Sequence, residues 1–181
     1  MKPNIIILAA AAALLASCKE KEAAKAESAP ATSSAAPTAE LSKILAAAPS
    51  GEATAIHVVR TSVKPGDEIT ISGKIMGTES PFVSGRAAFV LGDTETLTPC
   101  NEQPGDECKT PWDVCCETSE EIKAGTATIQ IVGADGRVLK ENLEGTGGLA
   151  KLAKVTVTGK VAEGSTADAL VVNATAIKAG D

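Results

Sequence analysis

Aromatic side chains are scarce in this 181-residue chain, which has no tyrosine, two phenylalanines and one tryptophan. Phe82, Phe89 and Trp112 leave little surface on which the bases of a single strand would stack. Basic residues are also in the minority, because residues 51–181 carry twelve lysines and arginines against nineteen aspartates and glutamates, a net charge of −7. An acidic domain without a basic stripe repels phosphate backbones. Nucleic acid is therefore not expected as a partner.

The signatures of common catalytic sites are missing as well. The single histidine, His57, lies in an apolar run and no Gly-x-Ser-x-Gly elbow accompanies it, so we expect a strand-edge histidine that faces solvent. The glycine-led stretch 145–148 lacks the lysine of a phosphate loop. No pair of carboxylates stands out as an acid and a base. We therefore expect a non-enzymatic protein without a cofactor.

The only long apolar run is at the N-terminus. Residues 1–17 contain an early positive charge at Lys2, an apolar run from Ile5 to Leu15, and small residues before Cys18. This layout is typical of a secretory signal peptide, and the run is shorter than the roughly twenty residues of a membrane span. The sequence thus predicts export.

The end of this segment, Leu15-Ala-Ser-Cys18, resembles the lipobox of bacterial lipoproteins. The resemblance implies cleavage before Cys18, a diacylglycerol thioether on its sulfur, and acylation of the new amino group. In Gram-negative members of that family a non-acidic next residue, here Lys19, points to the outer membrane, on its periplasmic side or at the surface. The alternative is an ordinary cleaved signal peptide in which Cys18 is only a small residue.

Residues 18–50 consist largely of alanine, serine, proline, glutamate and lysine. Such a segment buries too little surface to offset its ordering entropy, so we expect a disordered tether. Within it, apolar residues at helical spacing predict a short helix over 39–48, which Pro49 would end. The remaining chain, 51–181, is long enough for one folded domain.

Alternating apolar and polar residues predict short strands in this domain. Five main segments show the pattern: 68–75, 86–91, 127–132, 154–161 and 169–177. A further strand is expected at 55–59, a hairpin turn at Asp135-Gly136, and one or two helical turns over 145–152 with Thr146 as the N-cap. Three strands, a short helix and two strands is the order of the OB-fold, so we expect a partly open OB-like β-barrel. A small antiparallel sandwich of the same strands is the alternative.

Two stretches carry family resemblances. Leu149-x-x-Leu152 and the strands that follow it are similar to the closing part of OB-fold domains related to the anticodon-binding type. Pro111-Trp-Asp113 followed by Cys115-Cys116 resembles a group of uncharacterised bacterial lipoproteins, and this likeness extends over most of residues 51–181. It implies no activity.

Four cysteines, Cys100, Cys108, Cys115 and Cys116, lie within seventeen residues. In a small exported domain they predict two disulfides, which would join the first two cysteines to the last two in either order because adjacent cysteines pair poorly. The alternative is a metal site for copper(I) or zinc, although the usual Cys-x-x-Cys turns are missing. Redox exchange is a third alternative, which the acidic surroundings disfavour.

The cysteine stretch is expected to form an insertion between the second and third strands. OB-folds bind ligands on the face of these strands, between the loops that here would span 78–85 and 162–168. The candidate binding residues are Trp112, Asp113, Phe82 and Arg86. We therefore expect a lipid-anchored binding protein whose partner is another envelope protein or an extended small ligand. The alternative is an envelope protein that handles copper or zinc through the four cysteines, and nucleic-acid binding is a third hypothesis by analogy with the fold alone.

Replacement of Cys18 by alanine tests the anchor. In cells supplied with labelled palmitate, the natural chain is expected to incorporate label and to fractionate with membranes, because several acyl chains hold a protein stably on a bilayer. The Cys18→Ala chain should lose both properties, whereas Cys116→Ala, the matched control, should keep them. Label that persists in Cys18→Ala would contradict the assignment.

Overall fold

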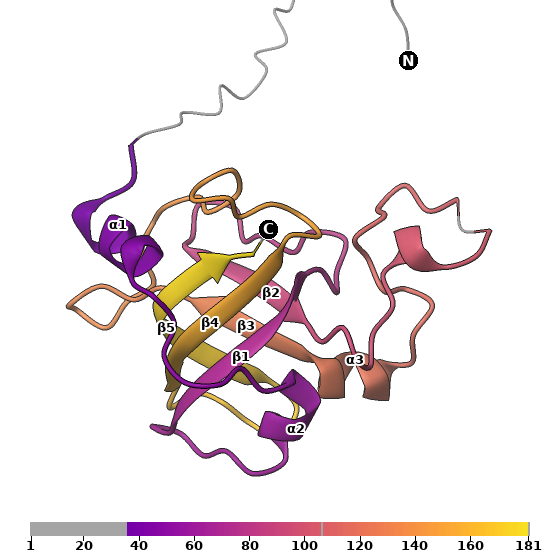
Figure 1. The fold of residues 1–181 in the computed structure, drawn as a ribbon, viewed down its shortest axis with the longest axis horizontal. Coiled ribbons are helices and arrows are strands. Elements are labelled where there is room, and N and C mark those ends of the chain that lie inside the picture. The colour runs from indigo at the N-terminus through magenta and orange to yellow at the C-terminus, as the bar shows by residue number, and fades with distance from the viewer. Residues whose placement is uncertain (1–35, 106, 181) are drawn as a thin grey trace, which may run out of the picture. The chain divides into compact units, whose positions relative to one another are not determined.

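The computed structural model describes residues 36–105 and 107–180. Five strands form a closed barrel in the order β1-β2-β3-β5-β4 (Figure 1). The strands are β1 Glu68–Ile75, β2 Ala88–Gly92, β3 Thr126–Gln130, β4 Lys154–Val161 and β5 Leu170–Ala179. Neighbouring strands are antiparallel except β3 and β5, which are parallel. This order and closure confirm the predicted OB-like barrel.

The alternating pattern of the strands accounts for the barrel core. Along β4, Val155 and Val157 are buried whereas Lys154 and Lys160 are exposed, as expected when successive side chains point to opposite faces. Gly73 allows β1 to approach β2 closely, since a Cβ at this position would lie 2.3 Å from the carbonyl oxygen of Gly92. The barrel thus buries alternate side chains along its strands, and it brings the backbones of β1 and β2 close together at Gly73.

The strand predictions from sequence are largely confirmed. The segments 68–75 and 154–161 coincide with β1 and β4, and the other three are displaced by one or two residues at their ends. The expected hairpin turn at Asp135-Gly136 forms, with a hydrogen bond from Gly133 N to the Arg137 carbonyl (2.9 Å). It is flanked only by an isolated bridge between Val132 and Val138.

The predicted helix within 39–48 is present as α1, Ala39–Ala46. Its N-cap Thr38 accepts a hydrogen bond from the Leu41 amide, and Leu41 is buried in the barrel core. Because α1 contacts β5, the compact unit begins at Ala36, earlier than the predicted boundary at 51. Residues 36–50 of the predicted tether therefore pack against the barrel, whereas the signal peptide, Cys18 and the rest of the tether lie outside the described residues. Among the described helices, none has the length and apolar character needed to span a membrane.

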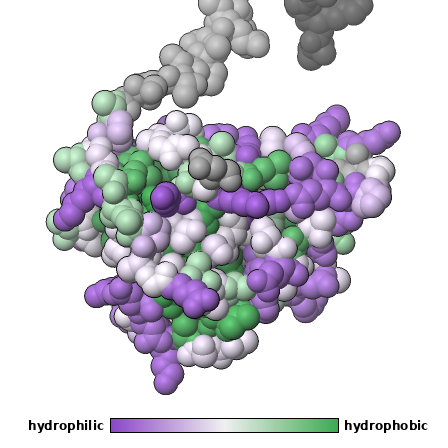
Figure 2. Space-filling model, in the orientation of Figure 1, coloured by the Kyte–Doolittle hydropathy of each residue, from purple (hydrophilic) through white to green (hydrophobic). Residues whose placement is uncertain are grey.

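The predicted strand at 55–59 is wrong, because α2, Ile56–Arg60, occupies that segment. Ile56 and Val59 are three residues apart and both buried, which suits one face of a helix. The run is too short for its sequence to distinguish this spacing from strand alternation. α2 lies at one end of the barrel (Figure 1), and Figure 2 shows a hydrophobic patch over it, where Val58 is 49% exposed.

The predicted helical turns at 145–152 are also wrong. Gly145, Gly147 and Gly148 have φ angles of 84°, 59° and 80°, and Leu152 has a φ of 66°. Left-handed backbone at these positions is incompatible with a right-handed helix. Leu149 nevertheless reaches the barrel core. The third α-helix of the described chain, α3 Ser119–Gly125, lies before β3 instead.

Candidate functional site

Residues 93–125 form an insertion between β2 and β3, as the sequence predicts. A hydrogen bond from Asp93 N to the Gly125 carbonyl (2.7 Å) joins its two ends. It contains the 3-10 helix η1, Cys100–Glu102, and α3, whose N-terminus is closed by a capping box between Thr118 and Glu121. In Figure 1 it extends from the side of the barrel away from α1.

A second apolar cluster fixes the insertion on the barrel. It comprises Met76, Leu97 and Val114, which are buried, with Trp112, Ile122 and Leu152 packed around them. Trp112 also bonds to the loop after β1, because its Nε1 donates to the Glu79 carbonyl (2.8 Å) and its own carbonyl accepts from Gly77 N (3.1 Å). The Lys151 ammonium lies 4.2 Å from the centroid of the indole ring. The tryptophan is thus an anchor of the insertion.

Within the insertion, hydrogen bonds hold η1 beside the Pro-Trp-Asp stretch. The amide of Cys100 donates to the Asp113 carbonyl (2.8 Å), and the amide of Asn101 donates to the Pro111 carbonyl (3.0 Å). An ion pair between Lys74 and Glu102 ties η1 to β1. These contacts determine where the cysteine side chains meet.

Three of the four cysteines converge. The Sγ atoms of Cys100, Cys108 and Cys115 all lie within 4.8 Å of one another, and those of Cys100 and Cys115 are 3.6 Å apart. Cys100 is buried, Cys108 is partly buried and Cys115 is exposed, so one side of this thiol cluster opens to solvent. Cys116 is exposed and does not belong to the cluster.

The sulfur spacing suits shared coordination of one ion. A disulfide requires about 2.05 Å between sulfurs, and no such bond joins the described cysteines, so the predicted pairing stays a prediction. An ion with metal–sulfur bonds of about 2.3 Å places its sulfurs about 3.8 Å apart in tetrahedral geometry and about 4.0 Å apart in trigonal geometry. The separation between Cys100 and Cys115 is close to these values.

The three thiols differ in acidity. Burial raises the pKa of Cys100, and the hydrogen bond with Cys100 raises the pKa of Cys115 to about 12. Hydrogen bonding with Thr110, whose Oγ1 lies 3.3 Å from the Cys108 sulfur, lowers the pKa of Cys108. Cys108 is therefore the first of the three thiols to ionise as the pH rises.

The four predicted binding residues lie in two separate parts of the fold. Trp112 and Asp113 are in the insertion beside the thiol cluster. Phe82 and Arg86 are in the β1–β2 loop, where Phe82 packs on the barrel core with its ring centroid 6.0 Å from that of Phe89, and Arg86 is exposed. The predicted surface stays a prediction, but two of its members, Trp112 and Phe82, have packing roles.

No pattern in the sequence indicates the polar pair at the base of the insertion. Asp93 is 1% exposed, and its carboxylate accepts hydrogen bonds from His57 N (2.9 Å), His57 Nδ1 (2.8 Å) and Glu95 N (2.9 Å). His57 was expected on a solvent-facing strand edge, which is wrong, since it lies on α2 and bonds this buried carboxylate. The partners are 36 residues apart, so no local pattern links them.

Asp93 also serves as a remote cap of α2. The N-cap residue Ala55 makes no side-chain hydrogen bond, and the Asp93 carboxylate accepts one of the amides that a helix N-terminus leaves unpaired. Burial acts to raise the pKa of Asp93, but the hydrogen bonds from His57 and Glu95 outweigh it, and the pKa lies below the ordinary value. The group therefore remains a carboxylate at neutral pH.

No protein-family model matches the chain, and no curated protein matches it. Among solved structures, the hypothetical protein ygiW from E. coli is similar, with 14% sequence identity, coverage of 73% of this chain and 94% of that chain, and a TM-score of 0.39. The OB-like assignment rests on the order of the strands and the closure of the barrel.

Replacement of Asp93 by asparagine tests its role. An amide nitrogen cannot accept the hydrogen bonds of the carboxylate, so Asp93→Asn is expected to lower the free energy of unfolding by about 1–3 kcal/mol at pH 7. Because the folded pKa is depressed, the stabilisation by the carboxylate is present above the unfolded pKa of about 3.9 and is lost as pH falls through the folded pKa.

Urea unfolding at several pH values between 7 and 2 measures this effect. The difference between the natural chain and Asp93→Asn should shrink toward the acid end. Asp168→Asn, which changes an exposed carboxylate, should have little effect at any pH. A difference that stays constant from pH 7 to 2 would exclude the carboxylate as its source.

Proposed function

We propose that the protein is a lipid-anchored envelope protein that binds a soft metal ion through Cys100, Cys108 and Cys115. The observation that supports this function is the convergence of the three sulfur atoms within 4.8 Å. Soft thiolate ligands select copper(I) and zinc. The anchor rests on the lipobox that ends at Cys18.

Copper(I) fits the donor set better than zinc. In the part of the chain that the structure describes, the cluster consists of three cysteines, without a histidine or carboxylate. Structural zinc sites take four ligands, and Cys116, the remaining domain cysteine, lies outside the cluster. Three sulfur donors and no hard ligand favour the softer, monovalent ion.

The exposure of the cluster favours exchange of the ion over permanent storage. Cys100 is fully buried, but Cys115 is exposed, so an ion held between them can be approached from solvent. The rigid insertion would present it at a surface that Trp112 fixes on the barrel. The expected envelope partner would then be a protein that gives or receives the ion, with thiolate or thioether ligands of its own.

Single cysteine variants separate the proposed ligands from their neighbour. The chain from residue 18 onward, with Cys18→Ser to keep it soluble, is titrated with copper(I) under anaerobic, reducing conditions against a chromophoric copper(I) chelator. We expect one ion per chain. Cys115→Ser should weaken binding by at least about 100-fold, since loss of an outer-shell partner alone costs about 10–100-fold.

Cys116→Ser is the matched control, because Cys116 is adjacent in sequence, also exposed and outside the cluster. It should bind copper(I) within about threefold of the parent chain, well below the effect of an outer-shell change. Cys115→Ser is expected to fold normally, which its circular dichroism spectrum checks, because its side chain is exposed. Equal losses in the two variants, or no loss in either, would refute the three-thiol site.

A further inference from the structure

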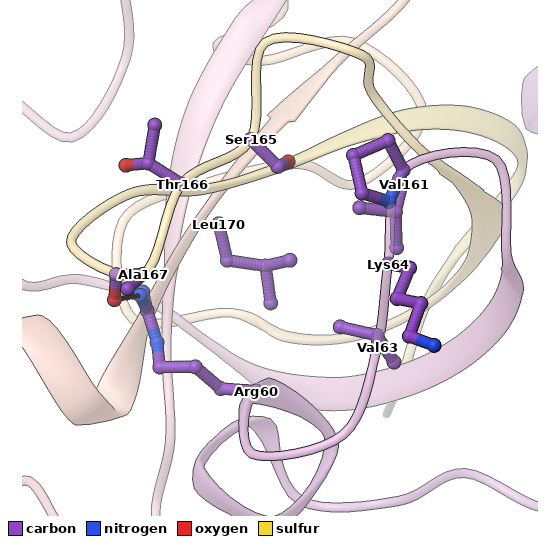
Figure 3. Close-up of a pocket in the computed structure, with 9 residues that line it drawn as sticks. Arg60, Val63, Lys64, Val161, Ser165, Thr166, Ala167 and Leu170 are labelled. Atoms are coloured by element: carbon purple, nitrogen blue, oxygen red, sulfur yellow. Dashed lines mark hydrogen bonds between the residues drawn. The ribbon is translucent and has the colours of Figure 1, made fainter.

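A pocket of about 280 Å³ lies between the segment that follows α2 and the loop that joins β4 to β5 (Figure 3). This loop is one of the two that the sequence predicts to flank a ligand site. The pocket is lined by Arg60, Val63, Lys64, Pro65, Val161, Ser165, Thr166, Ala167 and Leu170. None of these residues takes part in the thiol cluster.

The lining is positively charged although the domain is acidic. Arg60 and Lys64 contribute two cations, and no carboxylate lines the pocket. The ion pairs found among residues 36–105 and 107–180 involve neither of these side chains. Asp168, whose charge acts to raise the pKa of Arg60, has a side chain that is 81% exposed and pairs with Lys123. The pocket therefore carries positive charge that no ion pair offsets.

The guanidinium of Arg60 is held in place by neutral groups. Its Nη1 donates to the Ala167 carbonyl (3.0 Å), and its Nη2 donates to the Thr126 carbonyl. Its Nε is buried and has no hydrogen-bond partner. A buried donor without a partner is costly, and carbonyl oxygens do not neutralise the charge. Arg60 is thus fixed in position yet lacks an anion.

The rest of the pocket is suited to an apolar group with a polar end. Leu170 lies between Arg60 and Lys64 in the view of Figure 3, and Val63 and Val161 continue the apolar surface. The Thr166 hydroxyl oxygen accepts the amide of Ala169 and so helps to shape the loop. Two cations thus flank an apolar floor.

We propose that this pocket binds a small organic anion, with the acidic group held by Arg60, a short apolar tail on Leu170, and Lys64 adding positive charge at the rim. A carboxylate or a phosphate ester meets this description, since both accept charge-assisted hydrogen bonds from a guanidinium. The volume matches the lower end of the range for small-molecule sites, about 300–1,000 Å³, and so limits the tail to a few carbons. The site is independent of the metal proposal.

Amide NMR titrations of the chain from residue 18 onward, with Cys18→Ser, test the pocket. The probes are butyrate, its neutral isostere butyramide, and ethyl phosphate. Butyrate or ethyl phosphate should shift the amides of Ser165, Thr166 and Ala167 saturably, and butyramide should bind at least tenfold more weakly. The two anions together show whether a carboxylate or a phosphate ester is preferred.

Charge-removing variants locate the interaction. Lys64→Gln alters an exposed side chain and should keep the fold, and it should weaken the better anion about fivefold. Arg60→Gln should weaken it tenfold or more, provided that its spectrum shows an intact barrel. Lys178→Gln, an exposed lysine on β5 outside the pocket, should leave affinity unchanged. Equal shifts with butyrate and butyramide, or equal losses in Lys64→Gln and Lys178→Gln, would overturn the proposal.

Discussion

The carboxylate of Asp93 is buried at the point where the barrel, α2 and the insertion meet, and the arrangement of the three depends on how that charge is satisfied. Its oxygens accept three hydrogen bonds, two of them from His57 on α2. Its amide donates to Gly125 and so closes the base of the insertion. A buried charge is tolerated only when such bonds compensate its desolvation. Asp93 therefore positions both α2 and the 33-residue insertion, 93–125.

The thiol cluster depends on this closure and on a second fixed point. Trp112 bonds the backbone of the loop after β1 and joins the small apolar cluster beneath the insertion. With both ends and the middle of the insertion held, η1 and the segment that contains Cys115 have little freedom to separate. Convergence of Cys100 and Cys115 thus follows from the support around them, as a preorganised binding site requires.

The barrel could be predicted from sequence because the patterns that specify its strands lie within each strand. Alternating burial along β1 and β4 is visible in their residues, and so is the helical spacing around Leu41 in α1. The errors occurred where the decisive partner is remote. The N-terminus of α2 is capped by a hydrogen bond from the His57 amide to Asp93, which lies 36 residues away. The turns at 145–152 require left-handed backbone not only at glycines but also at Leu152. The four cysteines of the site could be identified from the sequence, but which three of them converge could not. The pocket formed by Arg60 and the β4–β5 loop could not be predicted either. Both features depend on tertiary packing.

The state of the four domain cysteines in protein taken from its own compartment tests the central proposal most directly. Native mass spectrometry of chain isolated anaerobically from the cell envelope, followed by denaturing mass spectrometry with and without reductant, reads metal content and disulfides in one sample. The three-thiol account predicts one copper ion per folded chain and no change of mass on reduction after denaturation. A chain without metal whose mass increases by two hydrogens for each of two disulfides would contradict the account and support the disulfide pairing instead.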